Sequence, residues 1–198
     1  MNNVENKIQI GLCIGTGFVS EGIELAEQIG DPGRDHYFSH AFIKTPNPSD
    51  SPIEYLVIEA LASGVAKEKW IETDYFRAYT GEKDANVKFC LLEYPVTLTD
   101  AQVKAIADKA YSLIDSGYDF WSYPSLVTKI LFKRLFGKKL WWWKKGKSAE
   151  HENFCSEVCA DSINAGMPGF FPEPYATSPQ DIYDYVLQAK LKIVWKNF

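Results

Sequence analysis

The part of the sequence that decides the fold is Asn153-Phe154-Cys155-Ser156-Glu157-Val158-Cys159-Ala160-Asp161-Ser162-Ile163. Its apolar residues recur at roughly helical spacing, and no proline interrupts before Pro168, so the pattern predicts a helix. Asn153 is an acceptable N-cap residue, which places Cys155 in the first turn of that helix.

A thiol at the start of a helix is favoured as a thiolate by unsatisfied backbone N–H groups and the helix dipole. A free thiol is only about 3% ionised at neutral pH. A histidine partner raises that fraction by at most roughly thirty-fold, and a lower thiol pKa weakens the nucleophile. Orientation and oxyanion stabilisation must therefore supply most of any catalysis. The alternative is that Cys155 is a small buried core residue, so the catalytic hypothesis needs a base elsewhere in the chain.

The composition suits one soluble domain. The chain has 198 residues and a formal net charge of −5, which argues against a general nucleic-acid binder. Its four cysteines form no paired C-x-x-C motif, so they resemble neither a zinc site nor a disulfide framework. We expect Cys13, Cys90 and Cys159 to be core residues, and we expect no metal and no cofactor.

The sequence also sets expectations about compartment. The N-terminus lacks a basic region followed by an apolar stretch, so no signal peptide is visible. No uncharged apolar run approaches the roughly 18 residues that a membrane span needs. We expect a cytoplasmic protein by default, with the cell envelope as the alternative if the sequence is a mature form that has lost a leader.

A candidate base lies in the predicted second strand, residues 37–43. Strand alternation predicts that Phe38, His40 and Phe42 share one face. His40 is then either a hydrogen-bonded core histidine or the base that Cys155 needs.

A candidate orienting acid lies in the predicted third strand, residues 54–60. Glu59 ends an apolar run, where an unpaired acid is costly to bury. A solvent-facing strand end would explain it. Beside an imidazole, Glu59 would instead fix the tautomer and stabilise the imidazolium.

The remaining patterns predict a mixed α and β protein. Apolar runs predict strands over residues 8–14 and 87–94. Thr99 and Gln102 form a capping box for a helix with one apolar face. Ser178 caps a late helix that reaches residue 187, with Pro179 at its first position, and residues 191–195 form a closing strand or tail.

Residues 122–147 depart from the acidic balance of the chain. They carry many lysines around Trp141, Trp142, Trp143 and Lys144. Cationic side chains beside adjacent tryptophans suit a membrane interface or an anionic, apolar substrate. The alternative is an insertion whose aromatic residues pack on the domain while its lysines stay solvated.

Taken together, these motifs resemble the circularly permuted branch of the NlpC-type papain-like cysteine hydrolases, close to the YiiX-like proteins and more distantly to the lecithin:retinol acyltransferases. The order His, Glu, Cys is the specific part of the resemblance, because unpermuted papain-like enzymes place the cysteine first. The motifs are Tyr37-Phe38-Ser39-His40-Ala41-Phe42-Ile43, Val57-Ile58-Glu59-Ala60 with Gly64-Val65, Gly117-Tyr118-Asp119-Phe120, Phe154-Cys155-Ser156-Glu157-Val158 and Ser178-Pro179-Gln180-Asp181.

The resemblance implies an α+β fold: a single circularly permuted papain-like domain over residues 1–198, with an antiparallel sheet packed against helices and the basic insertion at about 122–147. It implies Cys155 as nucleophile, His40 as general base and then acid, and Glu59 as its orienting partner. Tyr118 matches a family tyrosine that could donate to the oxyanion. His151 lies only four residues before Cys155 and is the competing base.

The leading hypothesis is a cysteine peptidase or amidase that cleaves a peptide, cell-wall peptide or N-acyl substrate through a thioester acyl-enzyme. One alternative is a lipid acyltransferase or esterase of the same chemistry. The other is a lipid- or peptide-binding module without turnover. The expected partners are a peptide or acyl substrate and a peripheral membrane contact, with no nucleic acid. The sequence leaves the substrate and the oligomeric state open.

Overall fold

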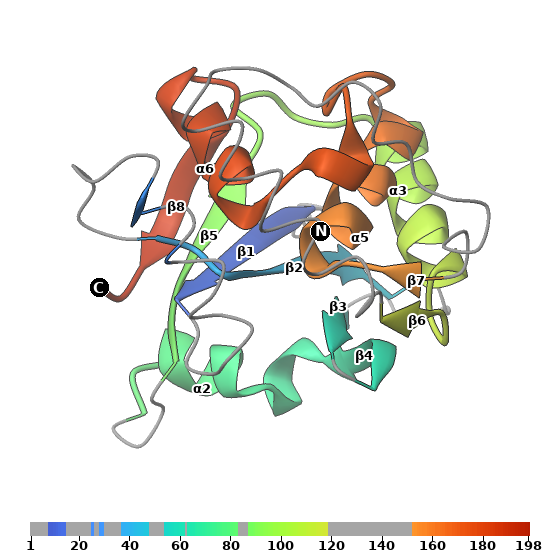
Figure 1. Cartoon of the computed structure of the whole chain (residues 1–198). Coiled ribbons are helices and arrows are strands. Elements are labelled where there is room, and N and C mark those ends of the chain that lie inside the picture. The colour runs from blue at the N-terminus through green and yellow to red at the C-terminus, as the bar shows by residue number, and fades with distance from the viewer. Residues whose placement is uncertain are drawn as a thin grey trace.

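A computed structural model describes residues 8–14, 37–47, 54–61, 63–82, 87–118 and 152–198, together with residues 25, 28 and 29. The fold is α+β and contains a six-stranded antiparallel sheet of order β4-β3-β2-β1-β5-β8, beside a parallel pair formed by β6 and β7 (Figure 1). The strands are β1 Gln9–Ile14, β2 His40–Pro46, β3 Tyr55–Leu61, β4 Gly64–Lys69, β5 Lys88–Glu93, β6 Gly117–Tyr118, β7 Glu152–Asn153 and β8 Lys192–Lys196. The helices are α2 Asp74–Tyr79, α3 Asp100–Ser112, α5 Cys155–Gly166 and α6 Pro179–Leu187, with short 3-10 helices η1 Trp70–Glu72 and η3 Pro174–Ala176.

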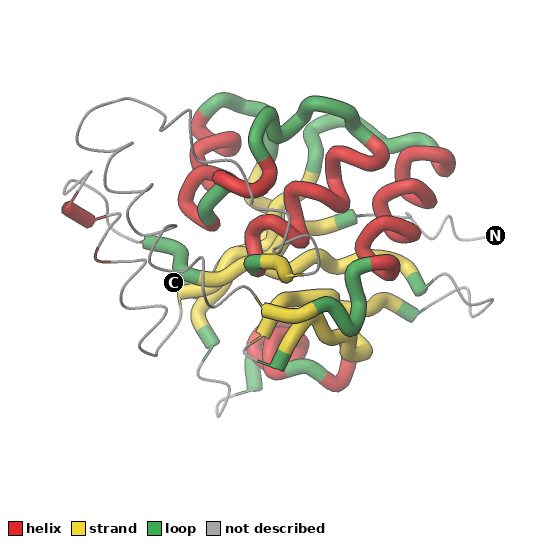
Figure 2. The backbone as a smooth tube through the Cα atoms, turned by 45° about the vertical axis from the view of Figure 1, so that its right-hand side comes forward, coloured by secondary structure: helices red, strands yellow, loops and turns green. Residues whose placement is uncertain are grey.

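Helices cover both faces of the sheet. Figures 1 and 2 show α3, α5 and α6 on one side and α2 on the other. The first side buries the larger core, which includes Leu12, Ile58 and Val158. The second side buries an aromatic cluster that includes Phe42, Trp70 and Phe89. The sheet is therefore apolar on both faces, which explains why its strands read as apolar runs.

Strands β2 and β3 pair along only part of their length. Their ladder ends at the Ile43–Ile58 pair. Beyond that pair, β2 continues to His40 beside β1, while β3 continues to Leu61 beside β4. The two strands diverge there, and α5 packs against both of them. Backbone groups that the strands no longer share must find other partners.

The start of α5 is anchored by short segments from distant parts of the chain. Tyr118 of β6 pairs with Asn153 of β7, two residues before the helix. β6 in turn adjoins β4, because the backbone N–H of Val65 donates to the carbonyl of Ser116 at 2.8 Å. Gly64 allows this approach: its φ is +116°, and a Cβ there would lie 2.8 Å from the Ser116 oxygen.

Most of the predicted elements are confirmed. The strands around residues 8–14, 54–60 and 87–94 are present, and the Thr99 capping box opens α3. Ser178 caps α6 as expected, and the closing segment is the strand β8. The sequence patterns did not predict residues 64–79, which form β4, η1 and α2.

The prediction that Phe38 shares a face with His40 and Phe42 is wrong. β2 begins at His40, so Phe38 precedes the strand and its alternation does not apply. Phe38 packs on Tyr183 of α6, with the ring centroids 4.8 Å apart, and belongs to the larger core. Phe42 lies on the opposite face, in the aromatic cluster.

The predicted insertion at 122–147 lies outside the described residues. None of the described helices combines the length and the apolar character that crossing a membrane requires.

Close packing of Phe42 over Gly11 gives a test of the aromatic face. The two residues are cross-strand partners, and a Cβ at residue 11 would lie 2.0 Å from a Phe42 ring carbon. We predict that Gly11→Ala lowers the free energy of unfolding by about 1–3 kcal/mol through overpacking, measured by urea denaturation. In a Phe42→Leu background, the same change should cost less, because the shorter side chain leaves room. Equal costs in the two backgrounds would contradict this packing.

Candidate active site

Three side chains that are far apart in the sequence meet where β2 and β3 diverge. His40 Nε2 lies 2.6 Å from Glu59 Oε2. The imidazole also forms a hydrogen bond with the Cys155 side chain. Because Nε2 faces the carboxylate, Nδ1 is the ring nitrogen left for the sulfur. The structure thus brings together the three residues that the sequence singled out.

The cysteine occupies the first position of α5. Phe154 is the N-cap residue, with φ −83° and ψ 159°. The prediction that Asn153 caps the helix is wrong, because Asn153 is held in β7 by pairing with β6. Cys155 is nonetheless in the first turn, where backbone N–H groups have no intrahelical partner. One of these groups, from Ser156, donates to the Cys155 sulfur.

A second backbone donor comes from β2. The N–H of Ala41 also forms a hydrogen bond with the Cys155 sulfur. Ala41 lies beyond the last paired residues of the β2–β3 ladder. We infer that the strand divergence frees this donor for the thiolate. The divergence therefore leaves space for the first turn of α5 and also provides a backbone donor to the Cys155 sulfur.

These contacts favour a thiolate–imidazolium pair. Burial acts to raise the pKa of Cys155, but the charge and hydrogen bond of His40 and the two backbone donors outweigh burial and lower that pKa below its ordinary value. Burial acts to lower the pKa of His40, but the thiolate and Glu59 outweigh burial and raise that pKa to about 10. Both shifts act toward a proton held by the imidazole rather than by the sulfur.

Strand register explains the approach of Glu59. Alternation along β2 and β3 puts His40 on the face of Phe42 and Glu59 on the face of Val57, and Phe42 and Val57 lie in the same aromatic cluster. Glu59 is 9% exposed. Its carboxylate also accepts a hydrogen bond of 2.9 Å from the hydroxyl of Tyr75 on α2. The acid is thus paired rather than solvent-facing.

Two further hydrogen bonds fix the elements that carry the site. Ser156 Oγ donates to the carbonyl of Thr177 at 2.7 Å, which ties the first turn of α5 to the segment before α6. The backbone N–H of Phe38 donates to Gln180 Oε1 at 3.2 Å, which ties the approach to His40 to α6. The late Ser178-Pro179-Gln180-Asp181 motif therefore lies close to the helix that carries Cys155 and to the segment that leads into the strand of His40.

Other predicted site residues are not placed. The backbone of Tyr118 lies in β6 beside Asn153, but its side chain lies outside the described part of the structure, so its oxyanion role stays a prediction. His151, Trp141, Trp142, Trp143 and Lys144 lie outside the described residues, so their proposed roles also stay predictions. The cysteines expected in the core, Cys13, Cys90 and Cys159, are all buried and unbridged.

Sequence reasoning missed Tyr75 and the Ala41 backbone donor. Thr73 before Asp74 is a helix-start signal, and Thr73 does cap α2 by accepting from the Phe76 N–H at 3.1 Å. That signal could have located the helix. The contact between Tyr75 and Glu59 depends on how α2 packs on the sheet, which no local pattern encodes.

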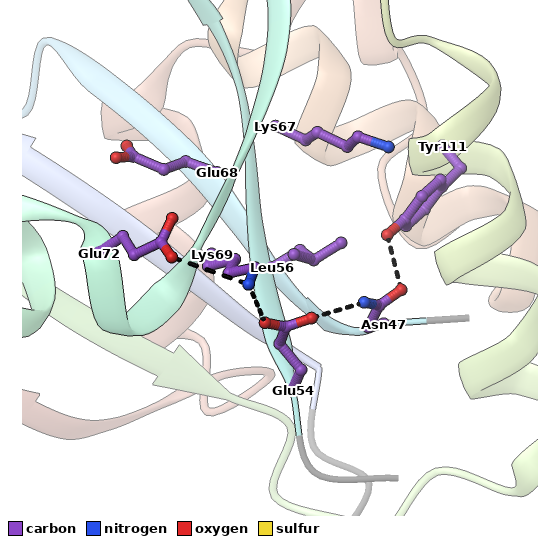
Figure 3. Close-up of a pocket in the computed structure, with 8 residues that line it drawn as sticks. All are labelled: Asn47, Glu54, Leu56, Lys67, Glu68, Lys69, Glu72 and Tyr111. Carbon is purple, nitrogen blue, oxygen red and sulfur yellow. Dashed lines mark hydrogen bonds and ion pairs between the residues drawn. The ribbon is translucent and has the colours of Figure 1, made fainter. Parts of the chain in front are cut away.

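A pocket at the β3–β4 edge is separate from these residues (Figure 3). Three of its charged groups form ion pairs: Lys69 Nζ lies 3.1 Å from Glu54 and 3.8 Å from Glu72. Leu56 on its wall points to the opposite face of β3 from Glu59, because the two positions differ by an odd number. The pocket is lined by Asn47, Glu54, Leu56, Lys67, Glu68, Lys69, Glu72 and Tyr111.

The ion pair predicts unusual reactivity of one thiol. We expect iodoacetamide to alkylate Cys155 faster than Cys159 at pH 7, because burial and the charges of Cys155 and Glu59 raise the pKa of Cys159. His40→Ala should slow the alkylation of Cys155 at least about tenfold, since one pKa unit changes the thiolate population tenfold. Peptide mass spectrometry over time measures both rates. Equal rates for the two cysteines, or no effect of His40→Ala, would refute the pair.

Comparison with known proteins gives a likeness of fold. The chain is similar to the crystal structure of the metalloprotein yiiX from Escherichia coli O157:H7, described as DUF1105. The likeness covers 98% of this chain and 98% of that chain, with 18% sequence identity and a TM-score of 0.49. No protein-family model and no curated protein matches the sequence. Within the described ranges, no group of three or more His, Cys, Asp or Glu side chains is arranged to hold a metal ion.

Proposed function

We propose that the protein is a cysteine hydrolase that cleaves an amide bond through a thioester acyl-enzyme. The observation that carries the proposal is the convergence of Cys155, His40 and Glu59, with a thiol pKa lowered and an imidazole pKa raised. Nucleophile, base and orienting acid within mutual reach are the arrangement that covalent catalysis requires.

Each group has a defined task in this reaction. The Cys155 thiolate attacks the carbonyl carbon of the substrate, and the imidazolium of His40 gives its proton to the departing amine nitrogen. A water molecule then attacks the thioester while His40 takes its proton, and the carboxylic acid leaves as the thiolate reforms. Glu59 stabilises the imidazolium in both halves and fixes which ring nitrogen faces the sulfur.

The developing oxyanion needs donors close to the sulfur. Cys155 is the first residue of α5, so its own backbone N–H has no intrahelical partner and is available to the oxygen. Tyr118 is the candidate second donor, because its backbone lies beside Asn153, two residues before the nucleophile. Removing one such donor typically costs about 3–4 kcal/mol of transition-state stabilisation.

The fold that this chemistry suggests is the circularly permuted papain-like, NlpC-type fold. Its support is the chain order His40, Glu59, Cys155, together with a helix that presents the cysteine at its first residue against an antiparallel sheet. The resemblance of the sequence motifs points to the same family.

The substrate that we propose is a peptide, a cell-wall peptide or an N-acyl compound. Cleavage of esters or transfer of acyl groups would use the same thioester, and the cationic, tryptophan-rich residues Trp141–Lys144 favour a substrate with an apolar acyl chain. A non-catalytic binding module would keep the ligand and lose the thioester, so detection of the covalent intermediate decides between the two classes.

Turnover tests the proposal directly. We predict that the protein hydrolyses members of a panel of peptidyl and N-acyl coumarin amides and acyl nitrophenyl esters, and that Cys155→Ala lowers kcat by about 10⁴-fold or more. Intact-mass spectrometry after rapid acid quench should show an acyl adduct on Cys155 that hydroxylamine removes. Cys159→Ala is the matched control and should retain activity, since Cys159 lies one turn along the same helix, fully buried.

Absence of turnover and of any acyl adduct with the wild-type protein, combined with ligand binding that Cys155→Ala preserves, would assign the binding module instead.

The pH profile of kcat/KM is expected to be bell-shaped. Raising the pH through the lowered pKa of Cys155 creates the thiolate, so the rate rises; raising it through the His40 pKa of about 10 removes the proton that the leaving amine needs, so the rate falls. Steady-state assays from pH 4 to 11 measure both limbs. An acid limb at the ordinary pKa of a free thiol would contradict the ion pair.

A further inference from the structure

The carboxylate that orients His40 has two partners on its own face of the sheet. Glu59 Oε2 lies 2.6 Å from His40 Nε2 and accepts at 2.9 Å from the hydroxyl of Tyr75. Tyr75 belongs to α2, which lies across the sheet from α5 (Figure 1). The same carboxylate oxygen of Glu59 is therefore the partner of both the imidazole and the phenol.

The phenol ring is fixed by packing rather than by its own hydrogen bond. Tyr75 stacks on Phe42 with the ring centroids 4.3 Å apart and the planes inclined by 23°, and its centroid lies 5.5 Å from that of Phe89. Phe42 lies on β2, two residues after His40. The strand that carries the imidazole thus also sets the position of the phenol.

A buried carboxylate needs this second donor. Glu59 is only 9% exposed, so protein donors matter to it, and a hydrogen bond from a neutral donor to an ionised acceptor is among the stronger kinds. The terminal torsion of a glutamate is broad. Without the phenol, Oε2 can rotate away from Nε2, and the imidazole loses its fixed orientation.

Cys13 is a second, neutral neighbour of the phenol. Cys13 is the cross-strand partner of His40 and forms a hydrogen bond with Tyr75. Burial and the charge of Glu59 raise the pKa of Cys13, so its thiol keeps its proton. The hydroxyl has one proton, and the carboxylate is the better acceptor, so the phenol donates to Glu59 at 2.9 Å.

The phenol stays a donor wherever the ion pair exists. Burial and the nearby Cys13 and Glu59 raise the pKa of Tyr75 above its ordinary value. Glu68 on β4 also feels the charge of Glu59, and burial together with that charge raises its pKa. The phenol and the Cys13 thiol beside the acid therefore keep their protons.

We propose that Tyr75 is a positioning residue of the site, whose hydroxyl holds the Glu59 carboxylate in the orientation that binds the His40 imidazole. This inference rests on the proposed thiol chemistry and adds a fourth side chain to it, reached through α2. A positioning role acts on His40 through Glu59, so the imidazole reports it directly.

The test is Tyr75→Phe, which removes the hydroxyl and keeps the ring that stacks on Phe42. Nitrogen-15 NMR of histidine-labelled protein follows the His40 imidazole, which is one of three in the chain. We expect its titration midpoint, about 10 in the wild type, to fall by about one pH unit, the shift that a lost hydrogen bond to an ion produces. The basic limb of kcat/KM should fall by the same amount. Tyr75→Met, which also lacks the hydroxyl, should give the same direction of shift.

Two controls separate positioning from a general loss of structure. Tyr79→Phe removes a hydroxyl from the same helix at a residue that is 45% exposed, and it should leave the His40 titration unchanged. In a Glu59→Gln background, Tyr75→Phe should add no further shift, because the hydroxyl acts through the carboxylate.

An unchanged His40 titration in both Tyr75→Phe and Tyr75→Met would overturn the inference while leaving the proposed function intact. A wild-type His40 that titrates at the ordinary value of a free imidazole would instead remove the ion pair itself, and the proposed function with it.

Discussion

The candidate site depends on the contact between a buried thiol and an imidazole. Cys155 is 4% exposed and the His40 side chain is 19% exposed. Separate charges in such a place would be costly, but a thiolate and an imidazolium in contact are neutral as a pair. The pair also needs hydrogen-bond donors to the sulfur and an acceptor for the second ring nitrogen of the imidazole. The Ser156 and Ala41 N–H groups meet this need for the sulfur, and Glu59 meets it for the ring.

The divergence of β2 and β3 makes this arrangement compatible with a continuous sheet. A fully paired ladder would bury the Ala41 N–H in a strand-to-strand bond and would leave no place for the first turn of α5. Ending the ladder at Ile43 and Ile58 releases the backbone of β2 while both strands keep a partner on their other side. α2 then completes the site from the opposite face, where Tyr75 reaches Glu59.

Local sequence patterns predicted many of the elements and the three central residues of the candidate site. Cap residues and apolar runs predicted α3, α6 and the strands β1, β3 and β5, because these signals depend on neighbours within one turn or two strand positions. Cys155, His40 and Glu59 stood out as polar groups in apolar settings. Three features were not accessible in the same way. Phe154 caps α5 because Asn153 pairs with Tyr118 of β6. Phe38 lies before the start of β2, so strand alternation does not apply to it. Tyr75 contacts Glu59 only because α2 packs on the sheet. Each of these depends on long-range packing.

The most direct measurement of the central claim is the ultraviolet difference absorption of the thiolate, taken between the wild-type protein and Cys155→Ala as a function of pH. The account predicts one thiolate per chain already at neutral pH, which disappears only on acidification and which His40→Ala abolishes at pH 7. A thiolate signal that emerges only near the ordinary pKa of cysteine, and that is the same with and without the imidazole, would contradict the account.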